Sequence, residues 1–296
     1  MNFIIKNKYL MITALIAIVV ALFLTVKSYQ IHYSSDFIDE VIYSSVLDEQ
    51  RKIFIRLPEN FDANKYYPLV IKSDGNFNLK RWDESLKRLS QTGEIDDSIV
   101  VAIPNQFWTD TRNRDLVPPY ARKEVNTEAR PATDNNKEIF GKADLFLAFI
   151  ETEVIPYIEH KYKINNNRIL SGFSAGGSFV LYTIVTKPDL FTGYFAFSPA
   201  AWYDSSVVVK EFAHALPNTA GKAKFLYLSL GGAENPIMTG AFNGLLSALK
   251  NKAPKNLSWD HSISPGAEHE ENPYVSLPKA ITAYYRFKAN NKLLNQ

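Results

Sequence analysis

A short glycine-rich sequence around Ser174 contains the residue types that nucleophilic catalysis by a hydroxyl group requires. It reads Gly172-Phe173-Ser174-Ala175-Gly176, with a glycine two residues before and two residues after the serine. A catalytic serine of this kind is exposed at a tight turn between a strand and a helix. Amides at the start of that helix can stabilise negative charge on a reacting carbonyl oxygen. The pattern therefore predicts that Ser174 is the nucleophile of an acyl-transfer reaction; the alternative is a small-residue turn that lets a helix pack closely on a sheet.

The proton of a serine hydroxyl must be accepted by a base, which in proteins is most often a histidine. The chain has five histidines, which are His32, His160, His214, His261 and His269. In hydrolases with this serine turn, the order along the chain is serine, then carboxylate, then histidine. His261 falls within a predicted strand, whereas His269 lies in the loop that follows it. We therefore expect His269 to be the general base and His261 to be a structural strand residue.

The histidine in turn needs a carboxylate that fixes its tautomer and stabilises its charged form. Glu234 follows a predicted strand at residues 224–230, which is the position where this fold carries the acid. Asp260, on the strand that precedes His269, and Asp204, after an earlier strand, are the alternatives. We expect Glu234 to complete a triad with the serine and the histidine.

Backbone amides should bind the negative oxygen that forms when a serine attacks a carbonyl group. One donor should be the amide of Ala175, at the start of the helix after the serine. The second should come from the loop after a predicted strand at residues 68–72, where Gly75 lets the chain bring the amide of Asn76 close to the reacting carbonyl. The predicted oxyanion hole therefore comprises Gly75, Asn76 and Ala175; the alternative is that Asp74-Gly75 is an ordinary turn.

The elements that would position these residues alternate between strands and helices. Strands are predicted at residues 51–57, 68–72, 99–103, 168–171, 194–197, 224–230 and 257–263. Helices are predicted at residues 144–162 (with a kink at Pro156), 176–186, 241–250 and 277–287. Short continuous apolar runs such as residues 99–103 are typical of strands covered on both faces. Together with the serine turn, this order predicts an α/β-hydrolase fold, with a mostly parallel central sheet and helices on both faces.

Residues 105–141 show little periodicity of either kind. This segment contains the pair Pro118-Pro119 and four arginines, which are Arg112, Arg114, Arg122 and Arg130. Long segments of this kind are often lids, and this one follows a central strand on the side where open α/β sheets bind ligands. We expect it to shape the substrate site; the alternative is a surface excursion without function.

The first thirty residues differ in composition from the rest of the chain. Residues 9–26 are apolar and uncharged, and Lys6 and Lys8 precede them. A run of this length is near the lower limit for crossing a bilayer, and the preceding lysines would keep that end in the cytoplasm. We predict a signal anchor or signal peptide at residues 1–30 and one folded domain at residues 31–296. The domain would face the periplasm from the inner membrane, or be periplasmic or secreted if the segment is cleaved; a buried helix is the alternative.

Charge and composition exclude several other classes of protein. Removing Lys6, Lys8 and Lys27 takes the formal charge from +2 to −1, and no basic run suited to nucleic acid is left. The chain has no cysteine, which excludes disulfides, thiol catalysis and thiolate metal sites. It also lacks the GxxxxGK[ST] phosphate loop, the GxGxxG dinucleotide turn and the HExxH metal helix. We predict no cofactor, no metal and no nucleic-acid partner, but a small-molecule substrate and a membrane contact through the N-terminal segment.

The order of these features resembles that of the putative esterase family, the esterase D-like α/β-hydrolases. That family includes trilactone siderophore esterases, feruloyl and acetyl esterases, and mycolyltransferases. The resemblance covers residues 44–285. It rests on several short sequences, which are Tyr67-Pro-Leu-Val-Ile-Lys-Ser-Asp-Gly75, Arg112-Asn-Arg-Asp-Leu116, Arg168-Ile-Leu-Ser-Gly-Phe-Ser-Ala-Gly-Gly177, Phe197-Ser-Pro-Ala-Ala-Trp202 and the loop of His269.

The resemblance implies the same triad of serine, glutamate and histidine. It also implies a substrate pocket that involves residues 112–115, and we expect Arg112, Arg114 and Trp202 to bind substrate. The chain departs from the commonest pattern of the family with Phe173 and Ala175 beside the serine, in place of histidine and leucine, and this leaves the shape of the acyl pocket open. We therefore expect a serine ester hydrolase that works through a covalent acyl-enzyme. The alternatives are an acyltransferase on the same triad and a catalytically silent, membrane-anchored binding protein.

Overall fold

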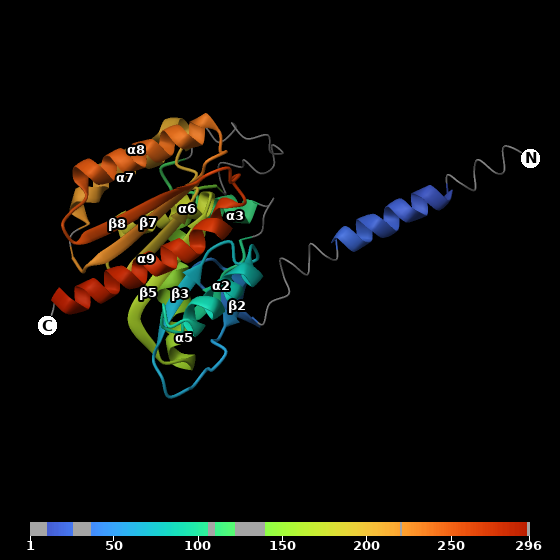
Figure 1. The fold of residues 1–296 in the computed structure, drawn as a ribbon, viewed down its shortest axis with the longest axis horizontal. Coiled ribbons are helices and arrows are strands. Elements are labelled where there is room, and N and C mark those ends of the chain that lie inside the picture. The colour runs from blue at the N-terminus through green and yellow to red at the C-terminus, as the bar shows by residue number, and fades with distance from the viewer. Residues whose placement is uncertain (1–10, 26–36, 106–109, 122–139, 220, 295–296) are drawn as a thin grey trace, which may run out of the picture.

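The computed structural model describes residues 11–25, 37–105, 110–121, 140–219 and 221–294, and a mixed β-sheet lies at their centre (Figure 1). Within these residues the sheet has eight strands in the order β1-β2-β4-β3-β5-β6-β7-β8. The strands are β1 (Ile38–Ser44), β2 (Glu49–Arg56), β3 (Tyr67–Lys72), β4 (Ile99–Ala102), β5 (Ile164–Phe173), β6 (Gly193–Phe197), β7 (Lys224–Gly231) and β8 (Leu257–Ser264). The β1–β2 and β2–β4 pairs are antiparallel, and the pairs from β4 to β8 are parallel. The C-terminal ends of the parallel strands therefore share one edge, where open α/β sheets bind ligands.

Helices cover both faces of this sheet. One face carries α2 (Leu79–Gln91) and α9 (Asn272–Leu294), which lie in front of the strands in Figure 1. The other face carries α4 (Ala143–Phe149), the π-helical turn η3 (Ile150–Val154), α5 (Ile155–Lys161), α6 (Ala175–Thr186), α7 (Tyr203–Ala215) and α8 (Pro236–Lys252). The short helix α3 (Asp110–Leu116) contacts α4 and α6, and η4 (Leu216–Asn218) continues α7. The predicted fold class, a mostly parallel sheet between two helical layers, is confirmed.

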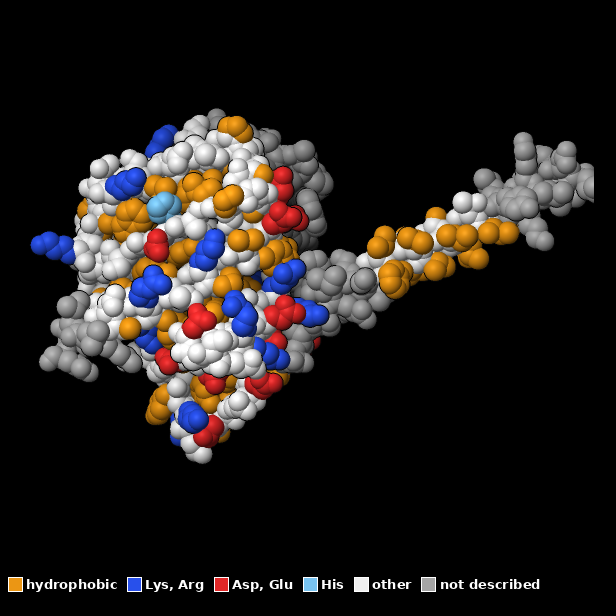
Figure 2. Space-filling view, in the orientation of Figure 1, with side chains coloured by type: hydrophobic (Ala, Val, Ile, Leu, Met, Phe, Trp, Pro, Cys, Tyr) orange, Lys and Arg blue, Asp and Glu red, His pale blue; other side chains and the backbone are white. Residues whose placement is uncertain are grey.

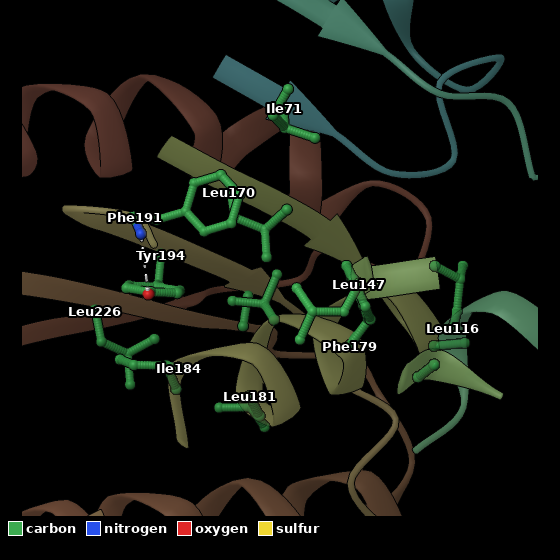
Figure 3. Close-up of a cluster of buried hydrophobic side chains, with 14 of the residues drawn as sticks. Ile71, Leu116, Leu147, Leu170, Phe179, Leu181, Ile184, Phe191, Tyr194 and Leu226 are labelled. Atoms are coloured by element: carbon green, nitrogen blue, oxygen red, sulfur yellow. Dashed lines mark hydrogen bonds between the residues drawn. The ribbon is translucent and has the colours of Figure 1, made fainter. Parts of the chain in front are cut away.

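Alternate residues of the central strands enter separate hydrophobic cores on the two faces. On β3, Leu69 and Ile71 belong to the core beneath α6, whereas Val70 between them belongs to the core beneath α2 and α9. Figure 3 shows part of the first core, to which Ile71, Leu170 of β5 and Phe179 of α6 contribute. Because both faces of these strands are removed from water, their sequences read as continuous apolar runs.

Several elements differ from the sequence prediction. The structure adds β1, α2, α3 and α7, and the predicted helix at residues 144–162 consists of α4, η3 and α5 in succession. The π-helical turn ends two residues before Pro156, which has no amide proton to donate to the helical hydrogen-bond ladder. A π turn absorbs such a defect without ending the helix. Where the sequence predicted a kink at Pro156, the structure has one π-helical turn just before it.

Residues 11–25 form a helix in which every side chain is exposed, and most of these side chains are apolar (Figure 2). Within the described residues, no helix is both long enough and apolar enough to span a bilayer. The ends of the predicted apolar run, at residues 9, 10 and 26, and the predicted domain boundary at residue 30 lie outside the described residues. The membrane segment and the boundary stay predictions.

Candidate active site

Ser174 lies in the sharp turn between the end of β5 and the start of α6. Its backbone angles, φ 56° and ψ −116°, fall outside the regions that residues other than glycine ordinarily adopt. The Ser174 amide donates to the carbonyl of Phe197 at 3.0 Å, and the Ser174 carbonyl accepts from the amide of Ala200 at 2.9 Å. Unusual backbone conformations that neighbours hold in this way are concentrated at functional sites. The strand-to-helix turn predicted from the sequence is therefore present.

Gly172 and Gly176 permit this turn because neighbouring groups leave no room for a side chain. A Cβ atom at Gly172 would overlap the carbonyl group of Gly176, and a Cβ atom at Gly176 would lie 2.6 Å from the hydroxyl oxygen of Ser73. The glycine spacing thus lets the start of α6 approach both β5 and the loop after β3. This approach brings the loop that starts at Ser73 against the turn of Ser174.

The structure brings His269 to the turn of Ser174 and Glu234 to His269. His269 lies between β8 and α9, and its Nδ1 is 2.8 Å from Oε2 of Glu234, which follows β7. The imidazole ring packs against Phe173, the residue before Ser174, with ring centroids 4.6 Å apart. In the described structure no hydrogen bond joins Ser174 Oγ to His269; such bonds are often long before substrate binds. The contact between Glu234 and His269 is therefore already formed beside the turn.

Glu234 is a buried carboxylate with donors on both of its oxygens. Its side chain has no exposed surface. Oε1 accepts from the amide of Gly231 at 2.7 Å and from the hydroxyl of Ser198 at 2.5 Å, while Oε2 faces His269. Burial by itself raises the pKa of Glu234, but the hydrogen bonds from His269, Ser198 and Gly231 outweigh it and hold the pKa below its ordinary value. Glu234 is therefore ionised at neutral pH and can stabilise a positively charged imidazole.

Asp260 and Asp204, the alternative acids, and His261 do not share the buried surroundings of Glu234. Asp260 is exposed on β8, where its carboxylate accepts a hydrogen bond from the backbone amide of His261 at 2.7 Å. His261 is exposed as well, with its ring 5.9 Å from that of Trp259 on the same strand. Asp204 lies at the start of α7, with φ 46°. The carboxylate hydrogen-bonded to His269 is that of Glu234.

Two backbone amides in the predicted oxyanion hole have no acceptor in the described part of the protein. Among the described residues, neither the amide of Asn76 nor that of Ala175 donates a hydrogen bond. Gly75 differs, because its amide donates to the carbonyl of Ile103 at 2.8 Å and a Cβ atom there would overlap the backbone of Ala102. Gly75 thus allows the loop to pass close to the end of β4. Binding of an oxyanion by Asn76 and Ala175 stays a prediction.

Buried polar groups that the sequence analysis did not single out hold the loop after β3. The side-chain nitrogen of Lys72 donates to the carbonyl oxygens of Asp74 at 2.7 Å and Ser73 at 3.3 Å. Burial lowers the pKa of Lys72 to about 7, although the nearby Asp74 carboxylate opposes this shift. The side-chain oxygen of Asn105 accepts from the amide of Asp74 at 3.0 Å. The signal in the sequence was a lysine at the end of an otherwise apolar strand.

The side chains predicted to bind substrate are engaged within the protein. The Arg112 guanidinium donates from Nε and Nη2 to the two carboxylate oxygens of Asp74, at 2.9 and 2.8 Å, and this pair is buried. Arg114 donates to the carboxylates of Glu49 and Asp115. Trp202 is partly buried and packs against the larger core. Contact of these three side chains with substrate stays a prediction. Arg122 and Arg130 of the predicted lid lie outside the described residues.

Replacement of Arg112 by methionine is expected to lower the free energy of unfolding by about 3–5 kcal/mol, because the buried Asp74 carboxylate would lose its partner. Urea unfolding of the full chain measures this loss. The double variant Arg112→Met/Asp74→Asn should recover part of it, since asparagine removes the unpaired charge and tolerates the φ of 50° at that position. A single variant as stable as the wild type, with a raised KM, would instead identify Arg112 as a substrate ligand.

Comparison with known proteins places this chain in a family. Residues 44–210, more than half of the chain, match the model of the family described as "Putative esterase". The chain belongs to the putative esterase family. This esterase is 29% identical to the ferri-bacillibactin esterase BesA of Bacillus subtilis (strain 168), over 66% of its own chain and 70% of BesA. It is 31% identical to the siderophore enterobactin esterase of Emericella nidulans, over 60% of its own chain. The match covers 61% of that relative, which is less than two thirds of its length.

Solved structures share the fold of this esterase. An IroE-like serine hydrolase from Shewanella oneidensis is 25% identical, with a TM-score of 0.76 over 85% of this chain and 80% of that one. The BES protein from Bacillus cereus is 23% identical, with a TM-score of 0.74 over 85% of this chain and 96% of that one. The family and these relatives identify an α/β-hydrolase-type enzyme that hydrolyses carboxylic esters, as the sequence analysis predicted.

Proposed function

We propose that this esterase acts through a covalent acyl-enzyme on Ser174, with His269 as the general base and Glu234 as the acid that orients it. The observation that carries the proposal is the 2.8 Å contact between Glu234 and His269 beside the strained turn of Ser174. A buried carboxylate, an imidazole and a hydroxyl at the end of a parallel sheet are the groups that serine hydrolysis needs.

The reaction has two halves. In the first, the Oγ of Ser174 attacks the ester carbonyl carbon while Nε2 of His269 accepts the hydroxyl proton. The oxyanion accepts hydrogen bonds from the amides of Asn76 and Ala175. The C–O bond to the alcohol then breaks, and His269 returns the proton to the leaving oxygen. In the second half, water attacks the acyl-enzyme with His269 as base, which releases the acid and restores Ser174.

For the substrate, we propose a siderophore ester with aromatic acyl groups. Support comes from the relatives named for bacillibactin and enterobactin, and from an aromatic surface beside the turn. The Phe77 ring stacks on that of Phe173 at 5.4 Å and lies 6.1 Å from Tyr274, whose other neighbour is the guanidinium of Arg81 at 4.9 Å. Aromatic rings with a nearby cation suit a flat, electron-rich acyl group.

An ester panel tests this substrate class on the full chain, purified in detergent. The panel pairs p-nitrophenyl acetate and butyrate with p-nitrophenyl benzoate and an aromatic trilactone siderophore, with and without bound iron. We expect kcat/KM for the trilactone to exceed that for the acetate by about 10²-fold or more, because remote contacts raise the stability of the transition state. A preference for aliphatic esters over both aromatic ones would contradict the substrate class. Acyl products that form on an added alcohol in preference to water would identify an acyltransferase.

We also propose that the domain works outside the cytoplasm. Support comes from the uncharged run at residues 9–26 and the lysines before it. A phosphatase reporter that is active only outside the cytoplasm, fused after residue 296, should be active in cells of a Gram-negative host. An inactive reporter on a stably produced fusion would contradict this location.

A further inference from the structure

Behind Glu234 lies a group of buried polar side chains that the proposed mechanism does not use. It comprises Ser198, Ser229, Ser264, Asn272 and Ser276, which come from four separate parts of the chain. Four of these residues have no exposed surface and Ser264 is 1% exposed. Burying a polar side chain costs free energy unless it is hydrogen-bonded, so the hydrogen bonds among these five residues determine how each side chain is oriented.

The direction of the hydrogen bonds follows from the carboxylate. Ionised Glu234 can only accept, so the hydroxyl of Ser198 must donate its single proton to Oε1. Ser198 Oγ then has only lone pairs left for Asn272, which lies 2.8 Å away. The side-chain nitrogen of Asn272 has protons and no lone pair, so it serves Ser198 as a donor. An amide at position 272 thus fixes the direction of the hydroxyl that holds Glu234.

Further contacts hold the Asn272 amide in this orientation. Its second N–H donates to Ser229 Oγ at 2.8 Å, and its carbonyl oxygen accepts from Ser276 Oγ at 2.7 Å. Ser276 Oγ in turn lies 3.3 Å from Ser264 Oγ. Asn272 therefore uses both side-chain N–H groups and its oxygen within the buried group, and the alternative orientation would set oxygen against oxygen at Ser198.

Asn272 also holds the loop that carries the histidine. Its backbone amide donates to the carbonyl of Glu268 at 3.0 Å, one residue before His269. Through its backbone and its side chain, a single residue at the start of α9 contacts the loop of the base and the hydroxyl that holds the acid. The position of Oε1 and the path of the histidine loop therefore depend on one another.

We propose that Asn272, acting through Ser198, is a positioning residue for the pair formed by Glu234 and His269. This inference rests on the proposed function of that pair. Loss of the amide leaves the Ser198 hydroxyl free to rotate, so that Oε1 of Glu234 loses a directed donor. The carboxylate is then less well oriented and more basic, and the pair takes up its proton at a higher pH. His269 is the titratable partner that Glu234 contacts among the described residues.

The test compares Ser198→Ala, Asn272→Ala and Asn272→Asp in the full chain with p-nitrophenyl acetate. We expect the alanine variants to lower kcat by about 10- to 100-fold, with KM changed by about twofold or less, because each removes a hydrogen bond that reaches a charged group. The acid limb of the pH profile of kcat/KM should move to higher pH. The shift should be largest for Asn272→Asp, which sets a second acid behind Ser198. The downfield proton resonance of the His269 Nδ1–H should move in all three variants.

Thr183→Ala is the matched control, because it also removes a fully buried hydroxyl, one that donates to the carbonyl of Phe179 within α6 at 2.8 Å. It should lower the unfolding temperature and leave kcat and the pH profile unchanged. If the Asn272 and Ser198 variants behave like Thr183→Ala, the positioning role is overturned. Labelling of the wild-type protein at Ser174 by a fluorophosphonate is measured in parallel. If the wild type is labelled and the variants keep the kcat and pH profile of the wild type, the positioning role alone is overturned. If the wild type is not labelled, the proposed function is overturned as well.

Discussion

Replacement of Ser174 by alanine is expected to lower kcat for hydrolysis of a p-nitrophenyl ester by at least about 10⁴-fold. Under the proposed mechanism the variant lacks the atom that would form the covalent intermediate, and no hydroxyl is left at the turn between β5 and α6 to take over the attack. The same change should abolish labelling of the protein by a fluorophosphonate. The fold should stay intact because alanine is smaller than serine and keeps the backbone hydrogen bonds that hold this turn. Steady-state kinetics, labelling and circular dichroism measure the three effects.

Ser178→Ala is the control for this experiment. Ser178 lies one turn further along α6, and its buried hydroxyl makes no hydrogen bond in the part of the chain that the structure describes. Removing a buried hydroxyl without a partner costs little stability. We expect this variant to be labelled and to keep its kcat. A Ser174→Ala protein that still reacts with the fluorophosphonate would show that the nucleophile is another residue.

Glu234→Gln is expected to lower kcat by about 10²- to 10⁴-fold while KM changes little. Glutamine keeps the size of the side chain, but it removes the negative charge that, under the proposed mechanism, stabilises the imidazolium of His269. It can also offer an N–H group to Nδ1, which would favour the wrong tautomer of the imidazole. Because Glu234 is buried among Ser198, Gly231 and His269, the loss cannot be screened by water.

Asp260→Asn is the matched charge-removing control, since Asp260 is exposed on β8 and its carboxylate contacts the amide of His261. This variant should keep the kcat of the wild type. The opposite result, an impaired Asp260→Asn and an active Glu234→Gln, would transfer the role of the acid to Asp260. Comparison of both variants at one pH near neutrality separates the two assignments.

The order of strands and helices could be predicted because periodicity is a local property of the sequence. The run at residues 99–103 and the turn at Ser174 gave β4 and the start of α6 within a residue or two. α2 was missed although Leu79, Trp82, Leu86 and Leu89 have helical spacing and are buried along one side of it. Charged residues such as Arg81 and Lys87 separate the apolar ones, so this segment has no continuous apolar run.

The pairings within the site could be predicted only where the fold itself dictates them. Chain order limited the acid to residues between Ser174 and His269, and the position of Glu234 just after a predicted strand favoured it over Asp260 and Asp204. This reasoning could not connect Arg112 with Asp74 or Asn272 with Ser198, since no order along the chain links those partners and they meet only when the sheet is assembled. From the sequence alone, an arginine near a predicted site is interpreted as a ligand for an anionic substrate. Only the structure shows that Arg112 is paired with a buried carboxylate. A serine that only orients another side chain has no sequence pattern.

The turn that leaves β6 supports two members of the site at once. The carbonyl of Phe197 and the amide of Ala200 hold the backbone of Ser174, while Ser198 between them holds the carboxylate of Glu234. A single inserted or deleted residue here would displace Ser174 and Glu234 in the same step. Efforts to redirect this enzyme to new esters by exchanging loops should therefore preserve the length of this turn and vary other connections at the same edge of the sheet.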